Sequence, residues 1–387
     1  MKAYIVGGAV RDRLLGESVN DRDWVVVGAT PGAMVAAGYR PVGRDFPVFL
    51  HPDTHEEHAL ARTERKARPG YHGFVFHAAP DVTLEQDLAR RDLTINAMAL
   101  DPDTDTVIDP FGGQRDLAAR VFRHVSDAFS EDPVRLLRIA RFAARWPQFT
   151  VAEETRALLR RLVANGEVDA LQSERVWQEV SRGLAEARPS RMIDVLRDAG
   201  ALARLAPELD AWLADDARCS VLMPLIDDAP AAPPSIRFAC LCHGVDAATL
   251  PHAPRLEALC ERWRVEADTR LLSLLVAREW PAIAMADDFG APQCLELLER
   301  ADAWRRPGRL SLASAAFDCL AAALPGRVCE RARARIAALQ RALSAAQAVS
   351  VASLPAAVRR AAGEGPALGR ALREARLQAI GSALAGP

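Results

Sequence analysis

The sequence predicts an α+β protein whose N-terminal part mixes strands and helices and whose remainder is all helical. Two observations predict this division. Short β-branched runs broken by glycines and turns are confined to roughly the first 120 residues. From about Asp132 onward, apolar residues recur at helical spacing instead. The length of 387 residues allows two or three domains, and an apolar fraction of 50% is typical of globular proteins.

The expected strands and helices of the N-terminal part follow in a regular order. An apolar run over residues 3–6 predicts a strand that ends at Gly7-Gly8, and a helix is expected over 10–15. The run over 23–27 is continuous and β-branched enough for a buried strand. Further strands are expected at 47–50, 58–61 and 107–108, before a turn at 109–113.

The helical part is predicted from apolar spacing. Leu136, Leu137, Ala140 and Ala144 recur as on one face of a helix. A stretch rich in proline and alanine over 224–234 predicts a loop or linker within the C-terminal half. We expect three parts: a mixed head over 1–122, a helical neck over 123–206 and a helical body and tail over 207–387.

The charge is unevenly distributed along the chain. The formal net charge of −2 does not by itself indicate a nucleic-acid partner. However, residues 1–200 carry −3, residues 201–300 carry −7 and residues 301–387 carry +8. The basic tail is compatible with contact to a polyanion and equally with solvated helix faces.

Cysteine spacing and hydropathy indicate the cellular compartment. The seven cysteines include no Cys-x-x-Cys pair and follow no secretory signal, which predicts free thiols in a reducing cytoplasm. The longest apolar patch, residues 271–277, is far shorter than the roughly 20 residues of a membrane helix. We therefore expect a cytoplasmic protein that does not enter a membrane.

Asp21-Arg22-Asp23 is the first candidate site. If a strand begins at Asp23, side-chain alternation places Asp21 and Asp23 on one face, where their carboxylates repel each other unless a cation lies between them. Paired carboxylates at this spacing suit Mg²⁺, which completes its coordination with water and substrate phosphates. The alternative is a polar turn before a strand, which is what an isolated Asp-x-Asp usually forms.

The upstream segment Gly7-Gly8-Ala9-Val10-Arg11-Asp12 strengthens the metal interpretation. Glycines at a strand-to-helix turn let the backbone approach a ligand, and the N-terminus of the following helix attracts phosphate. A phosphate-holding turn followed by a strand with paired carboxylates is typical of nucleotidyl transfer.

Four motifs in order carry a family resemblance. They are Gly7-Gly8-x-Val10-Arg11-Asp12, Asp21-x-Asp23, Arg90-Arg91-Asp92-Leu93-Thr94-Ile95-Asn96-Ala97 and Glu131-Asp132-x-x-Arg135-x-x-Arg138-x-x-Arg141-Phe142. Together with the segments at 43–49 and 55–57, they make residues 1–210 resemble the bacterial class II CCA-adding enzymes. These are tRNA nucleotidyltransferases of the poly(A) polymerase superfamily, with a palm-like catalytic head.

The resemblance implies a role for each motif. Asp21 and Asp23 would be catalytic and would hold two Mg²⁺ ions, one activating the tRNA 3′-hydroxyl and one stabilising charge on the α-phosphate and the departing pyrophosphate. Taken alone, residues 90–96 are also compatible with an ordinary helix that is capped near Asp92. The remaining residues of the head motifs would bind the nucleotide: Gly8, Arg11 and Arg91 at the triphosphate, and Asp92 and Asn96 near the ribose.

The fourth motif is the candidate for reading the base. On a helix, Asp132, Arg135, Arg138 and Arg141 recur every three residues and form a sloping polar ridge. An acceptor beside a forked donor can present the hydrogen-bonding edges of a template base. By resemblance, Asp132 and Arg135 select CTP and ATP, and the other two arginines help to bind the nucleotide. A Glu131–Arg135 ion pair on a solvated basic face is the alternative.

Two further segments refine the expectation. Residues 62–73 resemble the flexible loop that the family uses for the final A, which favours full CCA addition. In the body, His243-Gly244 stands where relatives carry the His-Asp pair of a phosphohydrolase, and Gly244 has no ligand atoms. We expect a degenerate domain of that kind, without phosphohydrolase activity.

The leading hypothesis is Mg²⁺-dependent addition and repair of the tRNA 3′-CCA end from CTP and ATP. The tRNA would be contacted at its acceptor stem and elbow, and no protein partner is implied. One rival is a bacterial poly(A) polymerase, which would carry Arg-Arg-Phe where this chain has Arg44-Asp45-Phe46. Another is a non-catalytic RNA- or nucleotide-binding regulator. A purely structural helical adaptor would leave the four head motifs unexplained.

Overall fold

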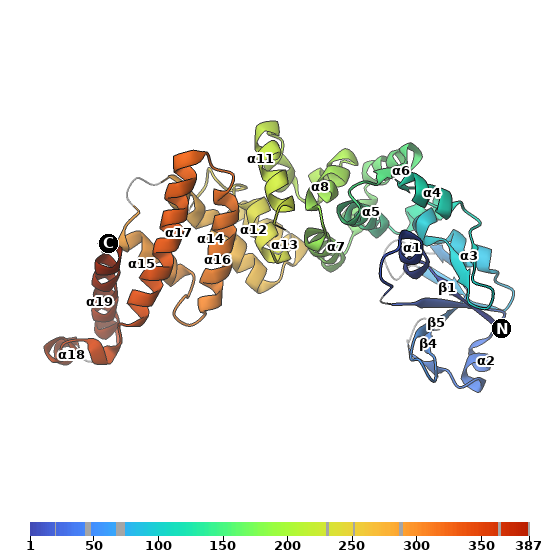
Figure 1. The fold of residues 1–387 in the computed structure, drawn as a ribbon, viewed down its shortest axis with the longest axis horizontal. Coiled ribbons are helices and arrows are strands. Elements are labelled where there is room, and N and C mark those ends of the chain that lie inside the picture. The colour runs from blue at the N-terminus through green and yellow to red at the C-terminus, as the bar shows by residue number, and fades with distance from the viewer. Residues whose placement is uncertain are drawn as a thin grey trace. The chain divides into compact units, whose positions relative to one another are not determined.

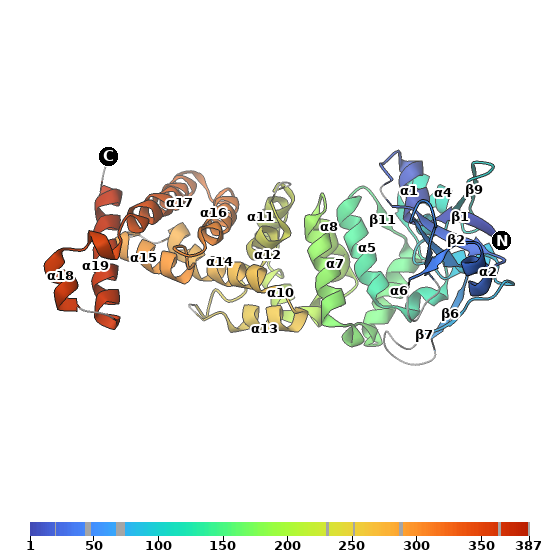
Figure 2. The same ribbon diagram turned by 90° about the horizontal axis from the view of Figure 1, so that it is seen from below.

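The computed structural model describes residues 1–19, 21–42, 48–66, 74–229, 232–250, 252–285, 289–362 and 365–385. Its contacts divide the chain into two compact units (Figure 1, Figure 2). One comprises Met1–Val176 and Arg191–Leu205, and the other comprises Trp177–Ser190 and Ala206–Pro387. The first contains a mixed sheet with helices and the second is helical, which confirms the predicted fold class.

A seven-stranded sheet forms the head. Its order is β3-β4-β5-β2-β1-β8-β9, with β2 and β5 parallel and the other neighbouring pairs antiparallel. The strands expected from the sequence are present within one residue of their predicted bounds, whereas β3 and β8 are not among the predicted strands. The strands are β1 (Lys2–Val6), β2 (Asp23–Val27), β3 (Arg40–Pro41), β4 (Val48–Leu50), β5 (Glu57–Leu60), β8 (Ala99–Asp101) and β9 (Thr106–Ile108).

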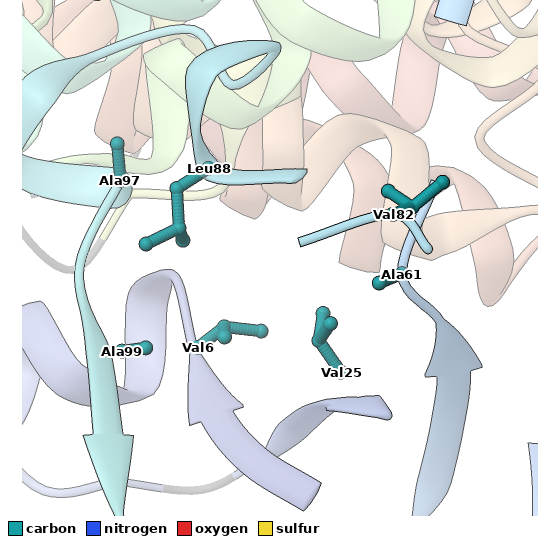
Figure 3. Packing of buried hydrophobic residues seen from close by; sticks show 7 residues of the cluster. All are labelled: Val6, Val25, Ala61, Val82, Leu88, Ala97 and Ala99. Carbon is teal, nitrogen blue, oxygen red and sulfur yellow. The ribbon is translucent and has the colours of Figure 1, made fainter. Parts of the chain in front are cut away.

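The register of β1 and β2 positions the candidate site. Val6 pairs with Asp23, so the first residue of β2 lies opposite the end of β1, immediately before Gly7. Val6 and Val25 are buried in one cluster with Leu88 (Figure 3). Because a slip by one residue would turn these valines out of the core, the register is strongly specified. The turn after β1 and Asp23 therefore lie at the same edge of the sheet.

Short helices and a hairpin complete the head. The segment 43–47 and residues 67–73 of the expected loop lie outside the described residues. The start of that loop segment forms a strand that pairs with the chain after it. The elements are α1 (Gly8–Leu15), α2 (Pro31–Ala36), β6 (Thr63–Lys66), β7 (Phe74–His77), α3 (Leu84–Ala89), η2 (Thr94–Asn96) and α4 (Gly113–Ala119).

The chain after the head is mostly helical. In α5 the predicted core positions Leu136, Leu137, Ala140 and Ala144 are all buried, as their spacing indicates. Two helices, α7 and α8, contribute residues to both compact units, so the three-part division at 122 and 206 stays a prediction. The elements are β10 (Val121–Phe122), η3 (Asp127–Glu131), α5 (Val134–Arg145), β11 (Thr150–Val151), α6 (Glu153–Ala164), η4 (Glu167–Ala170), α7 (Ser173–Ala185), α8 (Pro189–Asp198) and α9 (Ala201–Leu205).

The second unit is a succession of packed helices. The predicted loop over 224–234 is wrong in its first part, because α11 continues through Pro224 to Asp227. Pro224 lacks one N–H donor, but its carbonyl still accepts from the N–H of Asp228 at 2.8 Å. The elements are α10 (Pro207–Trp212), α11 (Asp216–Asp227), α12 (Pro234–Cys242), α13 (Pro254–Trp263), α14 (Ala267–Met285), α15 (Ala291–Arg300), α16 (Pro307–Ala321), α17 (Gly326–Gln347), η5 (Val351–Ser353), α18 (Ala356–Ala362) and α19 (Pro366–Ala385).

The cysteines lie in the second unit, and all seven are free. Burial raises the pKa of Cys260 to about 12 and that of Cys294 to about 11, so both thiols stay protonated near neutral pH. None of the helices in the described ranges is long and apolar enough to cross a membrane.

Candidate active site

One cleft in the first unit gathers most of the residues that the sequence singles out. It has a volume of about 460 Å³, and the turn after β1, the start of β2, the segment after α3 and one face of α5 line it. Asp21 is not among its lining residues. The predicted residues that do line it are Gly8, Arg11, Asp23, Arg91, Asp92, Asn96, Asp132, Arg135, Arg138 and Arg141.

The turn between β1 and α1 forms one wall of the cleft. Gly7 has a φ of 72°, which favours glycine, and a Cβ at this position would lie 2.8 Å from Nη1 of Arg91. A Cβ on Gly8 would lie 3.3 Å from Nη2 of Arg11. The two glycines therefore leave room for two guanidinium groups beside the first turn of α1. The unpaired N–H groups of such a turn favour anions.

Arg11 is buried between this turn and α5. Its Nε donates to Oδ1 of Asp12 at 2.8 Å, and its Nη1 donates to Oδ1 of Asn96 at 2.5 Å. The guanidinium carbon lies 4.5 Å from the ring centre of Trp146 and 5.4 Å from that of Phe142. Burial lowers the pKa of Arg11 from its ordinary value, while the carboxylate of Asp12 opposes this shift. The side chain is thus a fixed cation at the edge of the cleft.

Arg91 follows α3 and faces the same turn. Its Nη2 donates to Oδ2 of Asp87 at 3.3 Å, whereas its Nε is buried without a hydrogen-bond partner. Burial lowers the pKa of Arg91, and the negative charges of Asp87 and Asp23 oppose the shift. A buried N–H without an acceptor costs about 1–3 kcal/mol, so this group is prepared for an anionic ligand.

Asp92 and Asn96 form the floor. Oδ1 of Asp92 accepts from Nδ2 of Asn96 at 2.9 Å, and its Oδ2 accepts from Nε of Arg138 at 2.8 Å. Burial alone would raise the pKa of Asp92, but the Arg138 guanidinium and these hydrogen bonds hold it far below its ordinary value. The alternative of a capped α-helix near Asp92 is wrong: α3 ends at Ala89, and only the 3₁₀ turn η2 follows.

The fourth motif is not entirely helical. Asp132 precedes α5, which begins at Val134, because Pro133 at the N-cap sets the start of the helix. Both carboxylate oxygens of Asp132 accept from Arg175 of α7, at 3.3 and 3.1 Å. The guanidinium of Arg135 donates to two backbone carbonyls, those of Ala128 at 3.0 Å and Arg90 at 2.7 Å. The acceptor and the donor expected to read the base are therefore each held by a neighbouring element.

Arg138 and Arg141 lie further along the same face of α5. Their guanidinium carbons lie 5.5 and 4.6 Å from the ring centre of Phe142. The spacing of three and four residues places these cations on the cleft side, while Leu137 and Ala140 face the core. The ring of Phe142 therefore supports three guanidinium groups, counting that of Arg11.

Asp23 and Asp21 differ in position. Because β2 begins at Asp23, the alternation of a strand does not extend back to Asp21, and a shared face stays a prediction. Both side chains are exposed, and neither has a hydrogen-bond or ion-pair partner among the residues described. Within those ranges, no group of three or more His, Cys, Asp and Glu could hold a metal ion. Mg²⁺ bound to two carboxylates and substrate phosphates needs no such group.

The cleft is strongly basic. Eight arginines and three aspartates line it, giving the lining a net charge of +5. Such an excess of guanidinium groups around glycines and a helix N-terminus is complementary to a polyphosphate. Asp23, at the start of β2, adds one exposed carboxylate to this basic lining.

Sequence reasoning missed several lining residues. Arg90 and Phe142 lie inside the quoted motifs but had no role, and Arg145 lies one turn beyond Arg141, so the helical spacing could have found it. Nothing in the pattern around Arg175 marks it, since it lies on a separate helix and reaches Asp132 only through the fold.

The body differs at the expected phosphohydrolase position. A Cβ on Gly244 would overlap the Trp212 indole, so this ring fills the space that a metal-binding carboxylate would need. His243 packs edge-on against the same ring, and its Nδ1 donates to the carbonyl of Cys240 at 2.7 Å. Burial lowers the pKa of His243. The absence of phosphohydrolase activity stays a prediction, and the overlap with Trp212 gives a steric reason for it.

The head and the segment after it match known families. Residues 3–123 match the family described as Poly A polymerase head domain, and residues 148–213 match the one described as probable RNA and SrmB-binding site of polymerase A. These matches place the head and the segment after it in the poly(A) polymerase class of nucleotidyltransferases.

Curated relatives narrow the class. The Multifunctional CCA protein of Leptothrix cholodnii is 54% identical over 99% of this chain and 96% of its own length. That of Paraburkholderia phytofirmans is 59% identical over 82% of this chain and 85% of its own length. The chain therefore belongs to the family of multifunctional CCA proteins.

Solved structures share the fold. A CCA-adding enzyme in complex with ATP has a TM-score of 0.66 at 24% identity, covering 98% of this chain and 86% of that one. The Thermotoga maritima CCA-adding enzyme complexed with tRNA-CCA has a TM-score of 0.61 at 20% identity, covering 98% and 87%. At this identity the likeness concerns the fold.

Proposed function

We propose that the chain adds and repairs the 3′-terminal CCA of tRNA from CTP and ATP, releasing pyrophosphate. One observation carries this proposal: the glycine turn, Asp23 and the arginines of α5 converge on a single basic cleft. Membership of the multifunctional CCA protein family supports the choice of substrate over that of a poly(A) polymerase. A non-catalytic regulator has no need of two exposed carboxylates that lack a hydrogen-bond or ion-pair partner in the described part of the chain, as Asp21 and Asp23 do.

The triphosphate would lie between the turn and the segment after α3. Gly8 lets the phosphates approach the backbone, Arg11 supplies a fixed guanidinium, and Arg91 supplies a second whose buried Nε lacks an acceptor. Asp92 and Asn96 hold Arg138 and Arg11 in place and would lie near the ribose. This preorganisation lets the protein bind a fourfold negative ligand without rearranging its cations.

The base would be read by Asp132 and Arg135. A carboxylate accepts and a guanidinium donates, so together they match the donor and acceptor edges of cytosine and adenine. Arg175 and the carbonyl of Arg90 restrict these two side chains to one geometry. Arg138 and Arg141 would complete the nucleotide site.

Asp21 and Asp23 would hold two Mg²⁺ ions. Their exposed carboxylates accept no hydrogen bond and form no ion pair within the described residues, which fits the hard oxygen ligands that Mg²⁺ prefers. Bound Mg²⁺ would favour ionisation of the tRNA 3′-hydroxyl and neutralise charge on the triphosphate. The protein's own cations, Arg11 and Arg91, would hold the pyrophosphate as it departs.

The polymer substrate would be tRNA, bound at its acceptor stem and elbow, in the cytoplasm. The test uses three tRNA substrates: one that lacks CCA, one that ends in C and one that ends in CC. Each is incubated with one labelled nucleotide at a time. We expect C, C and A to be added in turn and the reaction to stop. A long A tract would instead identify a poly(A) polymerase.

The site assignment has its own control. Asp21→Ala with Asp23→Ala is expected to abolish incorporation of both nucleotides while tRNA binding remains measurable. Full activity of the double variant would overturn the metal assignment and leave the substrate assignment standing.

A further inference from the structure

We propose that Asp87 is a positioning residue that holds Arg91 at the phosphate side of the cleft. Asp87 belongs to α3 and does not line the cleft, and its side chain is fully buried at 0% exposure. No motif quoted from the sequence contains it. The inference rests on the proposed function, in which Arg91 binds the triphosphate.

Three separate groups donate to this one carboxylate. Oδ1 accepts from Nε and Nη2 of Arg90, at 3.2 and 3.1 Å. The same oxygen accepts from the backbone N–H of Arg62 at 3.2 Å. Oδ2 accepts from Nη2 of Arg91 at 3.3 Å. The carboxylate therefore joins α3, the two arginines that follow it and the start of the β6 segment.

The bond to Arg91 decides which of its N–H groups face the cleft. With Nη2 held by Asp87, Nη1 points toward Gly7, where a Cβ would approach it to 2.8 Å, and Nε stays buried without an acceptor. A free arginine side chain populates many rotamers, and a ligand would otherwise have to overcome the conformational entropy of ordering them. Asp87 removes that freedom before the nucleotide arrives.

Asp87 does not hold the base side of the cleft in the same way. It bonds to the Arg90 side chain, whereas the atom of Arg90 that accepts from Nη2 of Arg135, at 2.7 Å, is its backbone carbonyl. Arg135 is the proposed donor to the base. A change at Asp87 should therefore act on the phosphate-binding cation and leave the base-reading cation in place.

An asparagine could not replace Asp87. It would keep the size of the side chain and one acceptor oxygen, but it would turn an N–H₂ donor toward a guanidinium and leave two cations without a counter-charge. We expect Asp87→Asn to weaken binding of CTP and ATP about tenfold, as for the loss of a hydrogen bond to a charged group. CMP lacks the β- and γ-phosphates, so its affinity should stay within about twofold of wild type.

Equilibrium dialysis without tRNA measures these affinities, because no acceptor is present and no turnover occurs. The variants are Asp87→Asn, Arg91→Lys and the double variant, in which the two changes should not add, since Asp87 acts through Arg91. Asp101→Asn is the matched control: it is buried in the same head, pairs with Lys2 at the far end of β1, and should leave CTP affinity unchanged. Urea unfolding of each variant reports loss of stability separately.

The outcomes separate the two proposals. If the wild-type chain does not bind CTP, the proposed function fails. If Arg91→Lys weakens CTP binding and Asp87→Asn does not, the function stands and the positioning role is wrong. If Asp87→Asn weakens the binding of CTP and CMP equally, or if the effects add in the double variant, the positioning role is also wrong. Asp87 would then only stabilise the head.

Discussion

Nη1 of Arg11 donates to Oδ1 of Asn96 at 2.5 Å, although 85 positions separate the two residues. Asn96 in turn donates to Asp92, and Asp92 accepts from Arg138 of α5. These four side chains form one hydrogen-bonded chain across the floor of the cleft. A change in any member therefore alters the position of cations on both sides.

Asn96→Ala breaks this chain at its centre. Arg11 loses one of its two acceptors and Asp92 loses a donor, so both cationic walls lose support. We expect the KM for CTP and for ATP to rise about tenfold. Single-nucleotide incorporation on tRNA ending in C and in CC measures this. Asn165→Ala, at the exposed end of α6, is the control. If Asn96→Ala leaves the KM for both nucleotides unchanged, the proposed role of these hydrogen-bonded side chains is contradicted.

Gly7→Ala tests the glycine turn. Its φ of 72° strains any residue with a Cβ, and the added carbon would displace Arg91. Gly16 has a φ of 74° with nothing within 4 Å of its Cβ position, so Gly16→Ala imposes the strain without the clash. We expect both variants to lose about 1 kcal/mol of unfolding free energy or more. Only Gly7→Ala should lose CTP incorporation, and equal activities of the two variants would refute the contact.

Much of the head could be predicted because its strands bury continuous β-branched residues. The run at 23–27 is one example, and its bounds agree with β2. The two- and three-residue strands β3 and β8 form because the neighbouring strands provide hydrogen-bond partners, which no local pattern records. The alternative of a helix capped near Asp92 is wrong for a related reason: the carboxylate of Asp92 bonds to Asn96 and Arg138 rather than capping an α-helix.

The candidate site could be predicted where its residues lie in sequence motifs. Arg175 could not, since it reaches the site through a tertiary contact with Asp132. Asp87 lies three and four residues before Arg90 and Arg91, so helical spacing could have found it. The polar ridge from Asp132 to Arg141 was placed on the correct side, but its first member lies before α5, because Pro133 delays the helix. Local spacing predicted the face, and the proline determined where the helix starts.

Asp92→Asn should change how stability depends on pH. The folded-state pKa of Asp92 lies far below its ordinary value, so its ionised form stabilises the fold above pH about 4, and this contribution is lost as the pH falls further. We expect wild type to exceed Asp92→Asn by about 2–4 kcal/mol at pH 7. The difference should shrink below pH 4. Urea unfolding at pH 7, 5 and 3.5 measures it, and a constant difference would contradict the pairing with Arg138.

Gly244→Asp should not create a hydrolase. The new carboxylate would overlap the Trp212 indole, so we expect a loss of about 1–3 kcal/mol of unfolding free energy. Gly369→Ala, with nothing near its Cβ position, is the control and should not destabilise the chain. Neither wild type nor Gly244→Asp should open a 2′,3′-cyclic nucleotide with added divalent metals. Metal-stimulated opening by the purified wild type would show that the body keeps a second active site.

Neutralising the basic tail tests its contact with tRNA. Arg331 and Arg333 are exposed on α17, whereas Nη1 of Arg335 donates to the carbonyl of Ile283 at 2.8 Å and helps to pack the body. Arg331→Gln with Arg333→Gln should weaken tRNA binding about three- to tenfold and reduce the slope of log K against log salt by about 1–2.

Arg335→Gln serves as the contrast. It should lower the unfolding free energy and have less effect on the slope of log K against log salt for tRNA binding. Filter binding of tRNA between 50 and 200 mM salt measures this slope. Proteins that make many phosphate contacts lose about 10³–10⁵ in affinity over this range of salt, so the expected changes are resolved. The KM for CTP should stay the same in both variants, since the nucleotide cleft belongs to the other compact unit. If Arg331→Gln with Arg333→Gln binds tRNA as wild type does, the excess charge of α17 is an ordinary solvated face and the tRNA is held elsewhere.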